Sequence, residues 1–137
     1  GAWIAVRGQI DLTAILLGVA ALCWVGGFDI FYHFQDMDYD RHRGLFSIPV
    51  SYGVQTSLYI VRSSHFVMFA SLIAIAMLEN LQSVYLVGLG LVGALLVYEH
   101  SLIKANDLSR LNRAFFTVNG WISVAFFVFT TVDVLFV

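Results

Sequence analysis

The sequence predicts an all-α membrane protein with four transmembrane helices. The 137 residues are 60% hydrophobic and 12% charged, with a mean hydropathy of +0.85. A soluble domain carries about 25% charged residues, so this chain lacks the polar surface that water requires. Two further observations, the long apolar runs and the alternation of charge between the segments that connect them, also indicate a membrane protein with four spans. Backbone polar groups in lipid must be satisfied within the segment, which makes each long run a helix.

The first apolar run begins after Asp11 and Thr13, either of which can cap a helix. A span of about 20 helical residues crosses the hydrocarbon core. The second run is short for a span and can extend into the amphipathic stretch before it. The four predicted spans are residues 12–34, 64–78, 84–103 and 114–132.

Residues 50–63 mix polar and apolar side chains just after Pro49. This pattern predicts a short amphipathic helix at the membrane interface, and proline is tolerated near the start of such a helix. His65, at the beginning of the second span, is interpreted as an interfacial residue.

Six of the seven basic residues fall in two connections that lie on the same side of a four-span topology. The connection between spans two and three carries Glu79 and no basic residue. Basic loops face the cytoplasm. We therefore expect an integral protein of the inner (plasma) membrane with both chain ends outside. The six residues are Arg41, Arg43, Arg62, Lys104, Arg110 and Arg113.

The composition excludes several other classes of protein. The single cysteine, Cys23, excludes an internal disulfide and a thiolate metal site. A net charge of −2 argues against nucleic-acid binding. The chain begins at Gly1, and we expect residues 1–137 to form a single, partial membrane domain of a longer protein.

The chemistry is concentrated on one helix face at the end of the first span. At 100° per residue, Asp29, His33, Asp36 and Asp40 fall within about 60° of one another. Tyr32 flanks this face, whereas Asp38 points the opposite way. Gly44 is expected to end the helix.

Carboxylates four residues apart repel each other on a helix, and aspartates near a membrane are costly, so the face predicts a bound cation. Oxygen ligands suit Mg2+, which bridges one or two carboxylates to substrate phosphates. Asp36 and Asp40 are the expected ligands. The alternative is an acidic helix end in water, with its aspartates paired to Arg41, Arg43, Lys104 or Arg110.

The pattern Asp29-x-x-Tyr32-x-x-x-Asp36-x-x-x-Asp40, followed by Ser47-Ile48-Pro49-Val50 and Gly53, resembles the second aspartate-rich motif of the UbiA superfamily of intramembrane aromatic prenyltransferases. The lead-in from Trp24 to Asp29 is similar too. So are Tyr98-Glu99-His100-Ser101 and residues 107–120. Together these segments are most similar to the 4-hydroxybenzoate polyprenyltransferase branch, including its relatives in menaquinone biosynthesis.

The resemblance implies a helical bundle of about nine membrane helices, of which this chain matches the C-terminal four. The first aspartate-rich motif of the family, NDxxDxxxD, is not in this sequence. The chain is thus expected to act with the N-terminal half of the same protein, or with a complementary chain, and to be inactive alone.

The resemblance also implies the reaction and the residues that perform it. A polyprenyl diphosphate gives its prenyl group to an aromatic acceptor, a step of ubiquinone or menaquinone biosynthesis. Mg2+ on Asp36 and Asp40 holds the diphosphate, while Asp29 and Tyr32 act deeper in the site. Arg43, Lys104 and Arg110 are the expected diphosphate-binding residues, and His33 and Asn119 are expected to line the cavity.

Three points stay open in the sequence. The four spans can instead belong to a non-catalytic membrane subunit or a cation-handling transporter segment, and the acceptor can be of the haem or chlorophyll type. Asn119 can line the cavity or join helices by hydrogen bonds. Glu99 and His100 are interpreted mainly as a helix-end pair with Arg110 or Arg113, and otherwise as functional groups at membrane depth.

Overall fold

The computed structural model describes residues 1–113 and 116–137. Four of its helical segments are long and apolar enough to cross a membrane, which confirms the predicted fold class. The elements are α1 (Ala2–Arg7), α2 (Leu12–Arg43), α3 (Ile48–Leu78), α4 (Ser83–Leu102), η1 (Arg113–Val118), which is a π-helix, and α5 (Asn119–Phe136).

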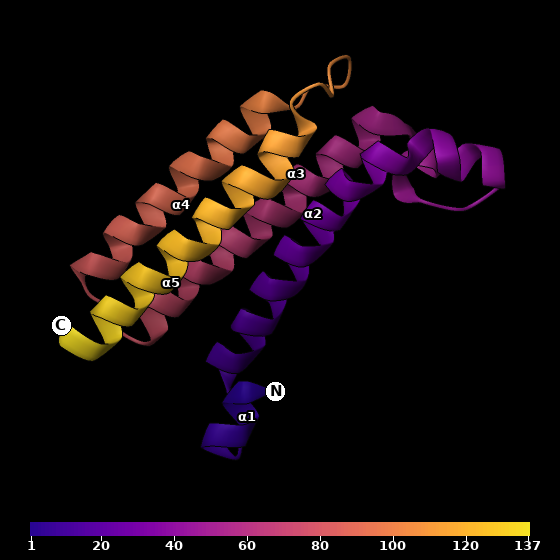
Figure 1. Ribbon diagram of the computed structural model, residues 1–137. Coiled ribbons are helices and arrows are strands. Elements are labelled where there is room, and N and C mark those ends of the chain that lie inside the picture. Colours follow the sequence, from indigo (N-terminus) through magenta and orange to yellow (C-terminus); the bar gives the residue numbers. More distant parts are fainter.

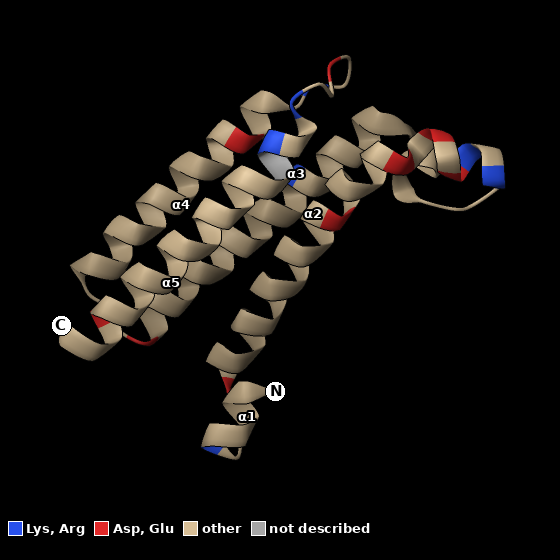
Figure 2. Ribbon diagram, in the orientation of Figure 1, with Lys and Arg blue, Asp and Glu red and all other residues tan. Residues whose placement is uncertain are grey.

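The long helices run side by side, and the N and C termini lie at the same end of the bundle (Figure 1). The α3–α4 connection is at this end as well. Lys and Arg gather at the opposite end, at the tip of α2 and beside the α4–η1 connection (Figure 2). The arrangement agrees with the four-span topology and its separation of charge.

Helix α2 extends nine residues beyond the predicted apolar span and ends where Gly44 was expected to end it. Gly44 has φ 65°, and the N–H groups of Gly44 and Leu45 donate to the carbonyls of Arg41 and Asp40. This left-handed turn is a Schellman motif, which favours glycine. At the other end, Asp11 caps the helix by accepting the Ala14 N–H at 2.9 Å. Thr13 does not cap α2; its hydroxyl donates to Glu79.

The separate interfacial helix predicted for residues 50–63 was wrong. A kink at Gly53, with φ 79° and ψ 162°, divides α3 into a short first turn and a long helix that continues to Leu78. Leu58 and Val61 are 2% and 0% exposed. Burial of these apolar side chains draws the stretch after Gly53 into the bundle, and the second span gains the length it lacked.

Glycines allow two close helix contacts in the core. A Cβ atom on Gly27 of α2 would lie 2.4 Å from Nε2 of His65 in α3, and one on Gly88 of α4 would lie 2.3 Å from Cβ of Phe129 in α5. Such contacts bring membrane helices together where lipid provides no hydrophobic driving force.

Candidate functional site

The aspartate face lies on the second half of α2 and consists of Asp29, His33, Asp36 and Asp40. The regular helix carries these residues on successive turns of one side. Nδ1 of His33 is 3.8 Å from a carboxylate oxygen of Asp40. Asp29 is exposed, Asp36 is half-buried and Asp40 is buried. The exposure of the carboxylates therefore decreases along α2 from Asp29 to Asp40.

Among the described residues, the carboxylates of this face have no Lys or Arg partner. Among the described residues, neither Asp29 nor Asp36 accepts a hydrogen bond, and no Lys or Arg nitrogen lies within 4.0 Å of Asp29, Asp36 or Asp40. Arg41 approaches Asp38 instead, at 3.9 Å on the opposite side. Arg43 stacks over the Tyr39 ring, 5.6 Å from its centroid. Within the described structure, the alternative of a salt-bridged helix end is therefore wrong for this face.

A hollow of about 480 Å³ opens beside Asp29 and His33. The chain after Gly44 folds back along α2, and its hydroxyl groups form the other wall. Ser47 is 8% exposed, and its Oγ has no hydrogen-bond partner among the described residues. The remaining lining residues are Gly26, Ile30, Phe46, Ile48, Ser51 and Tyr52.

Ser51 and Tyr52 were not predicted as site residues, although Ser47 and Gly53 belong to the motif that carried the family resemblance. Local periodicity does not reveal that this turn folds back on α2. Asp36 and Asp40 lie outside the lining of the hollow, further along α2 towards Gly44.

The connection between α4 and η1 carries Lys104 and Arg110. The backbone groups of Lys104 and Asp107 bond to each other, and the Ser109 N–H donates to the Asp107 carboxylate at 3.0 Å. Hydrogen bonds from Ser109 lower the pKa of Asp107, and the charges of Arg110 and Lys104 lower it further. The structure therefore places both cations beside an ionised aspartate of their own loop. Neither lines the hollow at Asp29.

The donors present fit Mg2+ better than a cation that needs an all-protein cage. No group of three or more His, Cys, Asp or Glu is close enough to hold a metal ion within residues 1–113 and 116–137. Asp36 and Asp40 offer two carboxylates, one turn apart, that no Lys or Arg of the described structure pairs with. Mg2+ keeps several waters and uses one or two carboxylates together with substrate phosphates, so this pair suits it.

A second polar group lies between the helices, at the last turn of α4 and the start of α5; we call it the core polar cluster (Trp24, His65, Glu99, His100 and Asn119). Glu99 is 0% exposed and accepts a hydrogen bond from Nδ2 of Asn119 at 3.1 Å. The indole N–H of Trp24 donates to Oδ1 of Asn119 at 3.0 Å. Nδ1 of His65 lies 3.2 Å from Nε2 of His100 and 3.8 Å from Oε2 of Glu99.

The cluster corrects two predictions. Glu99 and His100 do lie in the last turn of α4, but among the described residues their partners are Asn119 and His65 rather than Arg110 or Arg113. His65 is not interfacial, since it is only 2% exposed. Asn119 forms hydrogen bonds between helices, and its role as a cavity-lining residue stays a prediction.

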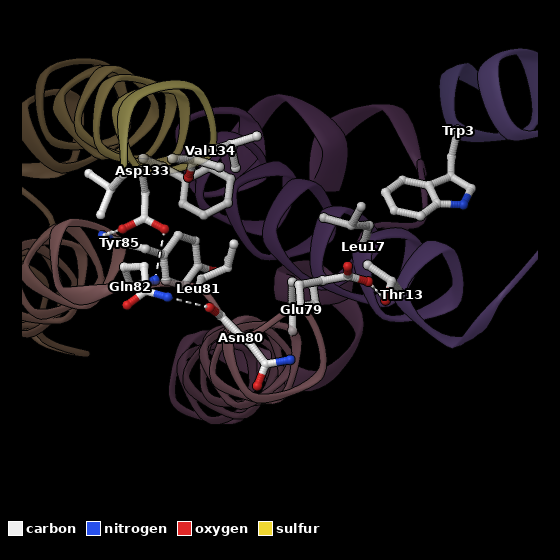
Figure 3. Close-up of a pocket in the computed structure, with 14 residues that line it drawn as sticks. Trp3, Thr13, Leu17, Glu79, Asn80, Leu81, Gln82, Tyr85, Asp133 and Val134 are labelled. Atoms are coloured by element: carbon white, nitrogen blue, oxygen red, sulfur yellow. Dashed lines mark hydrogen bonds between the residues drawn. The ribbon is translucent and has the colours of Figure 1, made fainter.

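The end of the bundle that holds the two termini, opposite the aspartate face, contains another hollow, of about 510 Å³. Two carboxylates, Glu79 and Asp133, lie on its wall (Figure 3). Asp133 of α5 accepts the backbone N–H groups of Gln82 and Tyr85, at 2.8 and 2.9 Å, and so caps the start of α4. Glu79 accepts the Thr13 hydroxyl. Each of these carboxylates is held by donors of the chain itself.

Comparisons with known proteins agree with the resemblance. The model of the UbiA prenyltransferase family matches residues 1–130. A 4-hydroxybenzoate octaprenyltransferase of Nitrosospira multiformis is 29% identical over 98% of this chain and 46% of its own length. Proteins with the same description from Xanthomonas oryzae pv. oryzae and Tolumonas auensis are 29% and 32% identical, over 93% and 92% of this chain.

The chain spans less than half of these relatives, since it covers 42% of the Xanthomonas protein and 43% of the Tolumonas protein. No solved structure matches it.

Proposed function

The chain belongs to the UbiA prenyltransferase family, and from this premise we propose that it is the C-terminal part of a Mg2+-dependent aromatic prenyltransferase. The enzyme moves a polyprenyl group from its diphosphate to 4-hydroxybenzoate or a related quinone-precursor ring. The relatives described as 4-hydroxybenzoate octaprenyltransferases support this acceptor. Family membership favours this function over a transporter segment.

The observation that carries the proposal is the aspartate face, whose three carboxylates have no Lys or Arg partner among the described residues, together with the hollow beside Asp29. The hollow of about 480 Å³ is within the range of about 300–1,000 Å³ that small-molecule sites occupy. Its wall combines apolar Ile30 and Ile48 with hydroxyl groups, which suits an aromatic ring that carries polar substituents.

Asp36 and Asp40 hold the metal in this proposal, and Arg43 binds diphosphate oxygens from the end of α2. Mg2+, when bound, neutralises the charge of the diphosphate and makes it a better leaving group. Lys104 and Arg110 approach the diphosphate from the α4–η1 connection. The negative charge of Asp107 in the same loop offsets part of the positive charge of Lys104 and Arg110.

Asp29 and Tyr32 act on the reacting atoms. The bond between the prenyl C1 and the diphosphate oxygen breaks, a bond forms between C1 and a ring carbon, and the ring loses a proton. Asp29 orients the acceptor and takes that proton, since its carboxylate is free of protein partners in the described structure. Tyr32 flanks the face, where its ring attracts the developing positive charge on the prenyl group. His33 lines the hollow on the next turn.

In this proposal the aspartate face forms one wall of the active site. A second wall, which carries the first aspartate-rich motif of the family, belongs to the N-terminal half of the protein or to a complementary chain. The partial match to the relatives supports this arrangement, because the four helices correspond to less than half of those proteins. The concentration of Lys and Arg at the same end as the aspartate face (Figure 2) supports a cytoplasmic site. The prenyl chain then extends among apolar helix surfaces within the bilayer.

Transfer assays on the full-length protein with single aspartate substitutions test the proposal. The assay contains Mg2+, a polyprenyl diphosphate and 4-hydroxybenzoate or a dihydroxynaphthoate. Asp36→Ala and Asp40→Ala are each expected to lower kcat/KM by about a hundredfold or more, since each removes charge stabilisation at the leaving group.

Asp38→Ala is the matched control, because Asp38 lies between the two on the same helix but points away from the face. We expect its activity to stay within about twofold of wild type, as for most substitutions at exposed positions. Full activity in both Asp36→Ala and Asp40→Ala would make the metal assignment wrong. Full activity of the 137-residue chain alone would contradict the requirement for a second wall.

A further inference from the structure

We propose that the core polar cluster is a positioning device that fixes the rotation and depth of α2, and thereby the placement of Asp29. The inference rests on the proposed function, because it assigns Asp29 to the reaction. It concerns five residues that lie outside the aspartate face and outside the hollow beside it.

All four spanning helices contribute to the cluster. Trp24 comes from α2, His65 from α3, Glu99 and His100 from α4, and Asn119 from α5. Glu99 and His65 are 0% and 2% exposed, and Asn119 is 9% exposed. Since every helix supplies a polar group to the same level of the bundle, a shift of any one helix breaks a hydrogen bond in apolar surroundings.

Asn119 is the central connection between α2 and α4. Its Oδ1 accepts the Trp24 indole N–H at 3.0 Å, while its Nδ2 donates to Glu99 at 3.1 Å. An amide side chain can accept through its oxygen and donate through its nitrogen at the same time. The apolar faces of membrane helices resemble lipid, so they fix rotation poorly, whereas directional polar contacts and small residues specify it.

A second contact holds α2 at the next turn. His65 lies against Gly27, where an added Cβ atom would come within 2.4 Å of the ring Nε2. Trp24 and Gly27 are three residues apart and therefore share one side of α2. Two contacts on this side, one a hydrogen bond and one a close approach, define both the angle and the height of the helix.

Asp29 follows Gly27 by two residues, about 3 Å along the helix axis. An error in the rotation of α2 at Gly27 is thus passed directly to the Asp29 carboxylate. Asp40 lies about 20 Å beyond Gly27, next to the Schellman turn that anchors its own end. We therefore expect the cluster to control the acceptor side of the site more than the metal and diphosphate side.

Alanine substitutions at two glycines of α2 test the close contact in the full-length enzyme. Gly27→Ala is expected to lower kcat by about tenfold, which is within the loss of up to about a hundredfold that a displacement of 1 Å can cause. The KM for the polyprenyl diphosphate should stay within about twofold, since Asp36 and Asp40 keep their positions. Gly18→Ala is the matched control on the same helix, because its Cβ atom meets nothing within 4 Å.

Substitutions of Glu99 separate hydrogen bonding from simple packing. Glu99→Gln keeps an oxygen that accepts the Asn119 amide, so its kcat should stay within about threefold of wild type. Glu99→Leu removes the acceptor and should resemble Gly27→Ala. Trp24→Phe keeps an aromatic ring but loses the N–H donor and the five-membered ring that carries it, and it should lower kcat by a smaller factor of about three to ten. Trp24→Phe tests the proposal if Gly27→Ala and Glu99→Leu prevent folding. Thermal denaturation in detergent shows whether each variant is folded.

Four results would overturn the positioning role. The first is a wild-type kcat in folded Gly27→Ala and Glu99→Leu, and the second is an equal loss of kcat in Glu99→Gln and Glu99→Leu. The third is a rise in the KM for the polyprenyl diphosphate as large as the fall in kcat, and the fourth is a wild-type kcat in Trp24→Phe when both Gly27→Ala and Glu99→Leu fail to fold. A wild-type enzyme without transfer activity would instead contradict the proposed function. These outcomes are distinguishable because the first four require an active wild type.

Discussion

The carboxylates at the two ends of the bundle differ in what surrounds them. At the end with the termini, Asp133 accepts two backbone N–H groups and Glu79 accepts a hydroxyl. At the other end, Asp29 and Asp36 accept no hydrogen bond from the described residues, and Asp40 has only His33 at 3.8 Å. Both ends carry acidic residues beside a hollow, but only one end leaves them available to a ligand.

The difference gives a criterion for separating structural from functional acids in a membrane protein. A carboxylate whose oxygens are satisfied by donors of the chain stabilises the fold, and its loss is felt as unfolding. A carboxylate kept near the membrane without such donors lowers stability unless a cation binds. Figure 2 shows acidic residues at both ends of the bundle, so position alone does not separate the two kinds.

The largest effect on stability is expected for substitutions of Asp133, which should lower the free energy of unfolding of the enzyme. Asp133→Leu leaves the N–H groups of Gln82 and Tyr85 without an acceptor at the start of α4, which should cost about 2–3 kcal/mol. Asp133→Asn keeps one acceptor oxygen and should cost about half as much. Denaturation midpoints in detergent measure both variants. Unchanged midpoints in both would remove the distinction between the two ends.

A smaller effect is expected when Mg2+ is added to the wild type. At ten times its dissociation constant, a ligand that binds only the folded state stabilises that state by about 1.4 kcal/mol. The shift in midpoint should shrink in Asp36→Ala and Asp40→Ala and persist in Glu79→Gln. A full shift in both aspartate variants would show that the metal binds elsewhere.

The smallest effect is expected for the same aspartates without metal. Asp36→Asn removes a like-charge pair with Asp40 one turn away, and relief of that repulsion should stabilise α2 by about 0.2–0.5 kcal/mol. Denaturation in the presence of a chelator, at low ionic strength, reveals it. Destabilisation by more than about 1 kcal/mol would mean that Asp36 has a structural partner and belongs with Asp133.

Much of the fold was predictable because it depends on local pattern. The apolar runs gave four spans, and the helical period placed Asp29, Asp36 and Asp40 on one face. Asp11 and Gly44 marked the ends of α2, since capping depends on residues close in the sequence. The spacing of Arg and Lys indicated which connections lie together.

The site was less predictable than the helices that carry it. The motif Ser47-Ile48-Pro49-Val50 supported the family resemblance, but the hollow beside Asp29 depends on how this turn folds back from Gly44. His65 was assigned to the interface because it stands at the beginning of the predicted second span, whereas it contacts Gly27, 38 positions away. Glu99 lies near two arginines in sequence and yet bonds to Asn119.

The sequence by itself determined the aspartate face, because hydropathy, helical period and caps act over one or two turns. Only the tertiary structure decided which carboxylates are satisfied. Asp133 finds its donors about 50 residues away and Glu79 finds Thr13 66 residues away. Such pairings depend on the packing of whole helices, and no local pattern encodes them. The same packing leaves Asp29, Asp36 and Asp40 without Lys or Arg partners in the described structure.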